Sequence, residues 1–216
     1  MAAGELDREK RLAAEAAAAL VEDGMRVGLG SGSTVAYLLP ALGARGLRLR
    51  CVATSSQTEE RGRAVGLTIE PFDALDRLDI AIDGADQIAP DGWLVKGGGG
   101  AHTREKIVAA AADRFVVIAS HDKLVERISA PVPLELFRYG LAATLRELGA
   151  VELRDAPASP DGGVIADYVG QVGDPAELDA HLNAVPGVLG HGLFPPALVS
   201  EALVGRGEHV EAISFP

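Results

Sequence analysis

The chain has 216 residues, of which 48% are hydrophobic and 24% charged. This composition is typical of a globular protein with a substantial core and excludes a disordered chain. The single cysteine, Cys51, excludes an internal disulfide and a cysteine-rich metal site, and it indicates a reducing compartment. The formal net charge of -11 disfavours nucleic acids and anionic membranes as partners, because their phosphates carry the same sign.

No apolar run approaches the roughly 20 residues needed to cross a bilayer, and residues 1–20 carry charges where a signal peptide is apolar. We therefore expect a cytoplasmic protein. An anionic ligand must be met by local positive groups, and the chain has only four lysines, namely Lys10, Lys96, Lys106 and Lys123. Three of them fall between positions 96 and 123, which is a first indication of a site in that region, although chance alone would also explain the clustering.

The first 120 residues alternate between helix and strand patterns. An apolar stripe at helical spacing predicts a helix over residues 6–23, and residues 34–46, 57–66 and 101–114 also read as helices. Strand patterns cover residues 25–30, 47–54, 67–72, 78–83 and 115–120. Because helices and strands alternate and the central strands are dense in Val and Ile, the expected fold is α/β, with a parallel sheet covered by helices on both faces.

A smaller α+β domain is expected over residues 131–194. Pro131 and Pro133 interrupt regular structure at its start. The patterns predict helices over 141–148 and 174–185, the second capped by Asp174, and strands over 151–155, 162–170 and 188–194. Two further strands in the tail, around a Gly-Arg-Gly turn, return to the first domain. That domain therefore comprises residues 1–130 and 195–216.

Polar motifs follow four of the predicted strands. They cover residues 30–34, 54–58, 83–86 and 120–123. In an open parallel sheet the carboxyl ends of the strands lie at one edge, where ligands bind. We therefore expect these four motifs to converge in space.

The glycine loop at residues 28–34 joins a strand to a helix, so its N–H groups can cradle an anion. It lacks the lysine of a P-loop, and Ser33 replaces the third glycine of the dinucleotide fingerprint. A phosphate or a sugar phosphate is the better ligand, and a tight turn without a ligand is the alternative. Ser55 and Thr58 begin the next helix, and ordinary capping explains them as well as binding does.

Asp83 and Asp86 lie within an Asp-Gly-Ala-Asp motif at the end of an apolar strand. Two carboxylates there lose solvation and repel each other, which is tolerated when they meet hydroxyls or lysines or when they exchange protons. A solvated turn explains the motif equally well, because Asp-Gly is common in turns.

The segment 96–106 carries the strongest signal. Four consecutive glycines, residues 97–100, allow unusual dihedrals and a close approach of the backbone to a ligand. Lys96 precedes them, and Glu105 falls in the first turn of the following helix. A carboxylate base and an ammonium beside a glycine loop can remove a proton next to a carbonyl and stabilise the resulting oxyanion. Alone, Glu105 would be explained by the helix dipole, and the glycine loop favours catalysis.

Other side chains carry weaker signals. The five histidines lack the spacing of metal ligands, Cys51 reads as a core thiol, and Ser31 and Ser33 have no histidine partner nearby in the sequence. Lys123 follows a strand and can pair with a phosphate, although an exposed lysine is the commoner case. We therefore expect no bound metal.

The order and spacing of the motifs at 28–34, 54–58, 83–88, 96–106 and 119–123 closely resemble A-type ribose-5-phosphate isomerase. The resemblance extends to residues 131–135 and 184–194 and so spans essentially the whole chain. It implies a Rossmann-like α/β domain with a smaller α+β domain, assembled as a homodimer or homotetramer through contacts that involve the smaller domain. It also implies aldose–ketose isomerisation of D-ribose 5-phosphate and D-ribulose 5-phosphate, in the non-oxidative pentose phosphate pathway, without a cofactor or a metal.

The resemblance also assigns roles to residues. Glu105 matches the base that transfers the proton, Lys96 matches the group that holds the oxyanion, and Asp83 and Asp86 match groups for sugar hydroxyls and ring opening. The substrate- and phosphate-binding positions are Ser31, Gly32, Ser33, Thr34, Asp83, Gly84, Ala85, Asp86, Lys96, Gly97, Gly98, Gly99, Lys123 and Lys10.

Departures from the family pattern occur at Gln87, at His102 and in the stretch 194–205, and none of them removes a proposed catalytic group. Two rival functions share the fold. A sugar-phosphate sensor of a transcriptional regulator needs a DNA-binding module of roughly 50–60 residues, for which the chain has no room. An amino-sugar phosphate deaminase or a lactonase needs a catalytic histidine, and none is compellingly placed.

Overall fold

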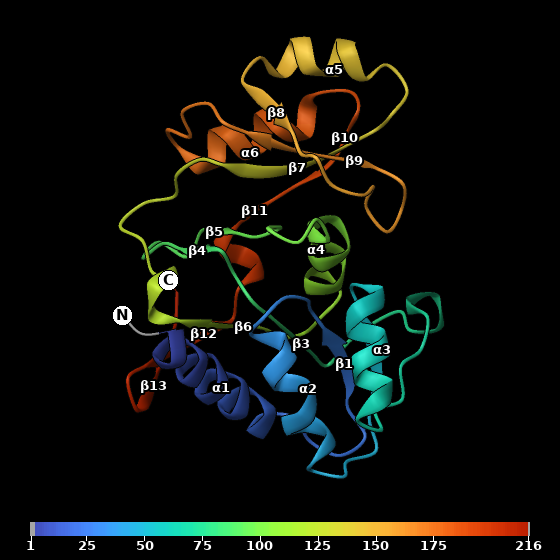
Figure 1. Cartoon of the computed structure of the whole chain (residues 1–216), viewed down its shortest axis with the longest axis vertical. Helices are drawn as coiled ribbons and strands as arrows, with labels where there is room; N and C mark the ends of the chain where they lie inside the picture. The colour runs from blue at the N-terminus through green and yellow to red at the C-terminus, as the bar shows by residue number, and fades with distance from the viewer. Residues whose placement is uncertain (1–2, 216) are drawn as a thin grey trace. The chain divides into compact units, whose positions relative to one another are not determined.

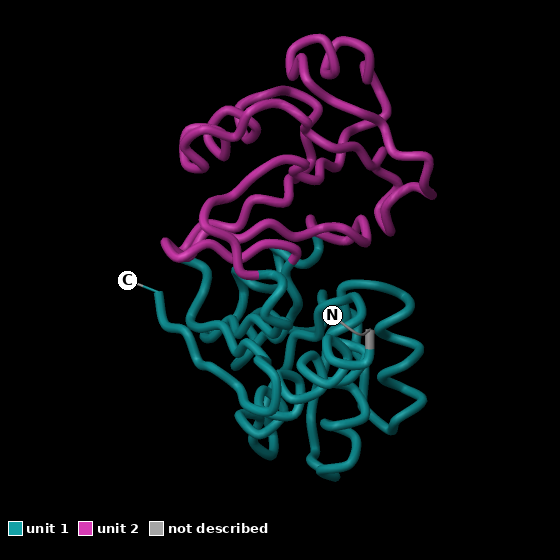
Figure 2. Tube along the Cα trace, turned by 60° about the vertical axis from the view of Figure 1, so that its left-hand side comes forward, with its two compact units in different colours: residues 1–85, 104–123, 197–216 teal, residues 86–103, 124–196 magenta. Residues whose placement is uncertain are grey.

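The computed structural model describes residues 3–215 (Figure 1), and the chain divides into two units (Figure 2). Each unit contains a hydrophobic core cluster of its own. Unit 1 contains the chain up to residue 85, residues 104–123 and the chain from residue 197. Unit 2 contains residues 86–103 and 124–196. The chain therefore passes from one unit to the other after residues 85, 103, 123 and 196.

A six-stranded sheet forms the centre of unit 1, in the order β13-β12-β6-β3-β1-β2. The neighbouring strands are parallel except for the pair β12 and β13. The strands are β1 (Arg26–Leu29), β2 (Arg50–Ala53), β3 (Ile80–Asp83), β6 (Phe115–Ser120), β12 (Glu201–Arg206) and β13 (His209–Ile213). This mostly parallel sheet confirms the predicted α/β class.

Helices cover both faces of this sheet. Val27 and Leu29 of β1 lie in the core cluster with residues of α1 (Ala3–Ala19) and α2 (Val35–Gly43). Gly28 points to the opposite face, where a Cβ atom would lie 2.5 Å from a methyl carbon of Val108 in α4 (His102–Ala110). The helix α3 (Ser56–Ala64) and the short 3-10 turns η1 (Phe72–Ala74), η2 (His121–Lys123) and η3 (Pro196–Leu198) complete these connections.

Unit 2 has two antiparallel sheets and two helices. Its larger sheet has the order β10-β7-β9-β8, and its smaller sheet has the order β11-β5-β4. The strands are β4 (Gln87–Ile88), β5 (Leu94–Val95), β7 (Val132–Leu136), β8 (Val151–Leu153), β9 (Val164–Tyr168), β10 (Val188–His191) and β11 (Leu193–Phe194). The helices α5 (Leu141–Leu148) and α6 (Pro175–Ala184) contribute Leu148, Leu178 and Leu182 to its core.

The expectation that Pro131 and Pro133 interrupt regular structure agrees with Pro131, which precedes β7 outside any strand, but is wrong for Pro133, which lies inside β7, an interior strand. The carbonyl of Pro133 accepts the N–H of Gly192 at 2.7 Å, so its nitrogen faces the same side. On that side the pairing of β10 with β7 has already ended, at His191 opposite Leu134. The sheet therefore needs no donor from the proline ring.

Two predicted strands also differ from the structure. Within 67–72, only Ile69 forms a bridge, with Cys51, before the chain bends at Pro71 into η1. The stretch 188–194 divides at Gly192 into β10 and β11, which belong to different sheets. Unit 2 also includes residues 86–103 and 124–130, which the sequence had placed in the first domain.

No helix within residues 3–215 is long and apolar enough to span a membrane.

Candidate functional site

Four loops of unit 1 follow the carboxyl ends of parallel strands. Residues 30–34 follow β1, residues 54–55 follow β2, residues 84–85 follow β3, and η2 follows β6. Because these four strands pair in parallel, the loops lie along one edge of the sheet. The sequence had placed polar motifs in these loops.

A cluster of Asp83, Ser31 and Glu105 lies at this edge. Asp83 is only 3% exposed, and its Oδ1 atom accepts the N–H groups of Ser31 at 3.0 Å and of Gly84 at 2.7 Å. The hydroxyl of Ser31 donates to Oε1 of Glu105, which is 5% exposed in the first turn of α4. Ser31 therefore links two buried carboxylates that the sequence had predicted independently.

The loop after β1 requires glycine at position 30. A Cβ atom on Gly30 would lie 1.9 Å from the carboxyl carbon of Asp83, which leaves no room for a side chain. The carbonyl of Gly30 accepts the hydroxyl of Thr58 at 2.8 Å, and Ser55 Oγ accepts the N–H of Thr58 at 3.2 Å. Ser55 is therefore the N-cap of α3, and the capping interpretation of this motif is observed.

A row of N–H groups follows in the same loop. Within the described part of the chain, the N–H groups of Gly32, Ser33 and Thr34 donate to no acceptor. Thr34 is the N-cap of α2, its side chain does not cap the helix, and Gly32 has a φ of +93°. The start of α2 thus offers several donors and the positive end of a helix dipole, which suits an anion.

Lys10 and Lys123 belong to segments that Glu9 connects. Glu9 is 1% exposed, and its carboxylate accepts the N–H of Gly207 at 2.7 Å and contacts Nδ1 of His121 at 2.6 Å. Burial alone would raise the pKa of Glu9, but these hydrogen bonds and the charge of His121 hold it below its usual value. Glu9 thereby joins α1, which carries Lys10, to η2, which carries Lys123.

Unit 2 holds a second group of predicted site residues. Lys96 is 2% exposed, and its Nζ lies 5.4 Å from the centroid of the Phe194 ring. Asp86 accepts the N–H of Gly98 through Oδ2 at 2.8 Å. Gly97 has a φ of +105°, and a Cβ atom there would lie 2.6 Å from Nδ1 of the fully buried His102. The structure therefore places Asp86, Lys96 and the glycine loop in one unit, and Ser31, Asp83 and Glu105 in the other.

The sequence did not single out Arg154, which contacts the glycine loop. Its Nη1 donates to the carbonyl oxygens of Gly97 at 3.1 Å and of Gly98 at 2.9 Å. Its Nε and Nη2 donate to the two carboxylate oxygens of Asp167, each at 2.6 Å. The hydrogen bonds and charge of Asp167 raise the pKa of Arg154 despite its partial burial. In the sequence, the only indication of this ion pair was that Arg154 and Asp167 carry opposite charges within two expected strands, 151–155 and 162–170.

Gln87, a departure from the family pattern, has a structural role. Its Nε2 donates to the carbonyl of Ser129 at 2.9 Å, and its Oε1 accepts the N–H of Ser129 at 2.9 Å. The amide thus pairs with both polar groups of one peptide residue. Glutamate could accept the N–H but could not donate to the carbonyl when ionised.

Comparisons with known proteins identify the same family as the motifs. Residues 50–209 match the family described as ribose 5-phosphate isomerase A (phosphoriboisomerase A). The ribose-5-phosphate isomerase A of Nitrobacter hamburgensis is 44% identical over 209 residues, covering 88% of this chain and 90% of that protein.

Solved structures agree with the sequence match. Ribose 5-phosphate isomerase A from Neisseria gonorrhoeae has a TM-score of 0.93 at 32% identity and covers 98% of both chains. A D-ribose-5-phosphate isomerase in complex with phospho-erythronic acid has a TM-score of 0.90 at 33% identity, covering 97% of this chain and 99% of that one. The resemblance predicted from the motifs is confirmed, and the chain belongs to the ribose 5-phosphate isomerase A family.

Proposed function

We propose that this chain interconverts D-ribose 5-phosphate and D-ribulose 5-phosphate through an enediolate intermediate. The family match and the relative that binds phospho-erythronic acid, a phosphorylated sugar acid, support this substrate class. The observation that carries the proposal is the buried carboxylate of Glu105, which Ser31 holds at the first turn of the helix after the glycine loop.

Glu105 is the proposed base. It takes the C2 proton of the ring-opened sugar and returns it to C1, while the hydroxyl proton of O2 passes to O1. The aldehyde at C1 thereby becomes an alcohol, and C2 becomes the ketone. Because Glu105 is 5% exposed, little water competes for the proton during the transfer.

Lys96 and the two aspartates complete the proposed chemistry. The ammonium of Lys96 stabilises the negative charge that develops on the enediolate oxygen, and its burial strengthens that interaction. Asp83 and Asp86 accept sugar hydroxyls and assist the opening of the ring. Glycines 97–99, together with Gly84 and Ala85, provide backbone contacts to the sugar.

The phosphate is assigned to the start of α2. The N–H groups of Gly32, Ser33 and Thr34 and the ammonium groups of Lys123 and Lys10 provide positive charge in a chain whose net charge is -11. The lysine side chains are 35% exposed for Lys123 and 18% for Lys10, so both can reach a soluble anion.

We further propose that the enzyme acts in the cytoplasm as a homodimer or homotetramer, with contacts from residues 131–194. This segment exposes large apolar side chains, among them Phe137 at 52%, Tyr139 at 85% and Leu153 at 51%. Exposed aromatic residues are enriched at protein–protein interfaces.

Glu105→Gln tests the assignment of the base. We expect kcat on ribose 5-phosphate, measured by ketose formation without additives, to fall by at least about 10²-fold, since the amide cannot accept the C2 proton. Competitive inhibition by phospho-erythronic acid should be nearly unchanged, because the shape of the side chain is preserved.

Glu59→Gln is the matched control, because Glu59 is also an acid in the first turn of a helix, also belongs to unit 1, and has a side chain that is 41% exposed. Its kcat should equal that of the wild type. A wild-type kcat in Glu105→Gln would remove Glu105 from the mechanism, and a wild-type chain that produces no ketose would overturn the function itself.

A further inference from the structure

Arg154 connects the glycine loop to β9 through four hydrogen bonds. Two go to the carbonyls of Gly97 and Gly98, and two form a bidentate pair with Asp167. The side chains of Arg154 and Asp167 are only 21% and 18% exposed. Charge-assisted, bidentate bonds of this kind fix the plane of a guanidinium.

The loop itself has few means to fix its conformation. Glycine residues restrict the backbone least, and one turn hydrogen bond, from the N–H of Gly100 to the carbonyl of Gly97 at 3.0 Å, closes the loop. Gly97 and Gly100 have φ values of +105° and +75°. The orientation of the intervening peptides therefore depends on side chains outside the loop.

The contacts of Arg154 determine where the opposite ends of these peptides point. In a trans peptide, the N–H of a residue points away from the carbonyl of the residue before it. The N–H of Gly98 donates to Asp86, opposite the Gly97 carbonyl that Arg154 holds. The N–H of Gly99 lies opposite the Gly98 carbonyl, and it has no acceptor among residues 3–215.

A cation at the carbonyl end also strengthens the donor at the other end. Hydrogen bonds along a chain polarise one another, so a guanidinium on the Gly98 carbonyl makes the Gly99 N–H a better donor. Gly99 is exposed, which leaves this N–H accessible to a ligand. An oriented and polarised N–H is the type of group that stabilises an anionic oxygen.

We propose that Arg154 is a positioning residue of the isomerase reaction: it holds the Gly97 and Gly98 carbonyls so that the Gly99 N–H donates to an anionic oxygen of the sugar phosphate. Asp167 keeps the guanidinium in place. The inference rests on the proposed isomerase function. A lysine could not replace Arg154, since one ammonium cannot pair with both carboxylate oxygens and reach both carbonyls in fixed geometry.

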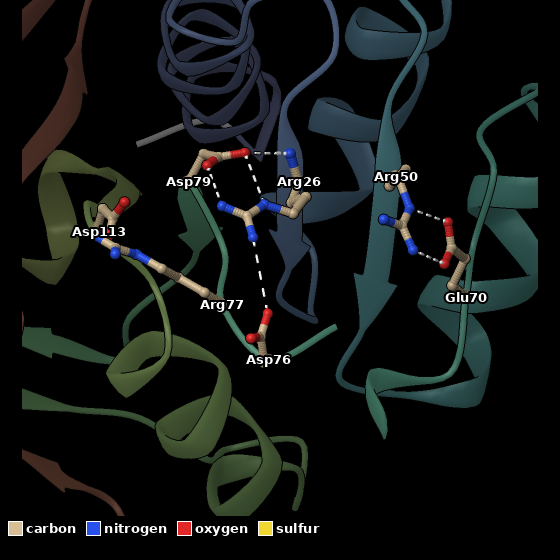
Figure 3. A network of polar contacts seen from close by, with 7 residues as sticks. All are labelled: Arg26, Arg50, Glu70, Asp76, Arg77, Asp79 and Asp113. Carbon is tan, nitrogen blue, oxygen red and sulfur yellow. Dashed lines mark hydrogen bonds and ion pairs between the residues drawn. The ribbon is translucent and has the colours of Figure 1, made fainter. Parts of the chain in front are cut away.

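Arg154→Lys tests this inference, with Arg50→Lys as the matched control. Arg50 forms the same bidentate pair, with Glu70 at 2.8 and 2.7 Å (Figure 3). It lies on β2 in unit 1, whereas the glycine loop belongs to unit 2. We expect kcat/KM on ribose 5-phosphate to fall about 10- to 100-fold in Arg154→Lys. The control should change less than about twofold.

Inhibition constants identify which oxygen receives the N–H. A weaker inhibition of Arg154→Lys by phospho-erythronic acid, with unchanged inhibition by inorganic phosphate, supports donation to the oxygen of the reacting carbons. A similar weakening of both inhibitors supports donation to the phosphate. Unchanged inhibition by both, together with a wild-type kcat/KM, overturns the inference.

A merely structural role would lower the melting temperature without changing kcat/KM of the folded protein, and that result also overturns the inference. Should Arg154→Lys not fold, Asp167→Asn provides the test, since it leaves Arg154 in the chain and removes its anionic partner. A partial loss of kcat/KM in folded Asp167→Asn supports the inference, and wild-type values contradict it. Wild-type turnover of ribose 5-phosphate, measured in the same assay, separates a failure of this inference from a failure of the proposed function.

Discussion

The position of Asp83 depends on a residue that has no side chain. Gly30 lies so close to the Asp83 carboxyl group that a Cβ atom would overlap it at 1.9 Å. Asp83 in turn accepts the N–H of Ser31, whose hydroxyl reaches Glu105. A methyl group at position 30 therefore acts on the proposed base through two hydrogen bonds.

We predict that Gly30→Ala displaces Asp83 and disturbs Glu105. A misplacement of about 1 Å at a catalytic group costs about 10²-fold in rate, so we expect a loss of that order in kcat/KM. The added methyl group also overpacks the site, which should lower the free energy of unfolding by about 1–3 kcal/mol. Steady-state kinetics and urea unfolding measure the two effects separately. Retention of wild-type kinetics would show that the proposed chain of contacts does not control the base.

Gly4→Ala is the control for this substitution. Gly4 lies in α1, has no neighbour within 4 Å of an added Cβ, and has a negative φ. Alanine there should raise the free energy of unfolding by up to about 1 kcal/mol, because it lowers the entropy of the unfolded chain. Its kinetics should match those of the wild type.

Individual site residues differed in how far the sequence could predict them. Glu105 and Lys96 were predictable because they flank four glycines within one short segment. The sequence predicted only that Asp83 needs polar partners, and the backbone N–H groups of Ser31 and Gly84 are two of the partners in the structure. Arg154 was missed because its contacts with Gly97 and Asp167 depend on how distant segments of unit 2 fold together.

Glu9 connects three elements of unit 1 through one buried carboxylate. It projects from α1, contacts His121 in η2, and accepts the N–H of Gly207 in the turn between β12 and β13. Its pKa is held below the usual value of 4.5 despite burial, because the hydrogen bonds favour the ionised form. The ionised form of Glu9 therefore stabilises the folded state.

We predict a pH-dependent loss of stability in Glu9→Gln. A depressed folded-state pKa contributes stability above the unfolded-state pKa, and this contribution is lost as the pH falls through the folded-state value. The variant should thus be less stable than the wild type by roughly 1.5–3 kcal/mol at pH 7, as for hydrogen bonds to charged groups. The difference should shrink as the pH falls below 4.5.

Urea unfolding at several pH values measures this difference in the free energy of unfolding. The contributions of the other carboxylates cancel in the difference, because those groups titrate in both proteins. Glu208→Gln is the control: Glu208 lies in the same turn, but its side chain is 86% exposed. That variant should unfold almost as the wild type does at every pH. A Glu9→Gln difference that stays constant down to pH 3 would contradict the assigned ionisation.

Whole elements were predicted best where the local pattern was long. The cap of α6 by Asp174, whose side chain accepts the N–H of Ala176 at 2.9 Å, agrees with the sequence. The two-residue strands β4 and β5 were missed because two residues show no periodicity. β7 was missed because proline cannot donate a hydrogen bond and is therefore rare inside a sheet. The sequence does not show that the nitrogen of Pro133 faces the side where β10 has ended.

The two units share the helix α4, so we expect their stabilities to be coupled. His102 and Thr103, its first residues, belong to unit 2, and residues 104–110 belong to unit 1. A nine-residue helix is marginal in isolation, so it depends on packing along its whole length. Loss of either unit should therefore weaken the other.

The chain carries one natural probe for each unit. Cys51, the single cysteine, is fully buried in unit 1, and burial raises the pKa of its thiol to about 12. Its thiolate is therefore scarce in the native state, so a thiol reagent should label it only when unit 1 opens. Trp93, the single tryptophan, packs against the core of unit 2 and reports on that unit by fluorescence.

We predict that both probes follow one cooperative transition in urea. Leu182→Ala makes the test sharper, because Leu182 is fully buried in unit 2 and its truncation should cost about 2–5 kcal/mol. If α4 couples the units, this change accelerates Cys51 labelling in unit 1 and lowers the Trp93 midpoint, and both measurements give the same loss in free energy of unfolding. If Cys51 labelling is unchanged while the Trp93 midpoint falls, the units unfold separately and α4 does not couple them.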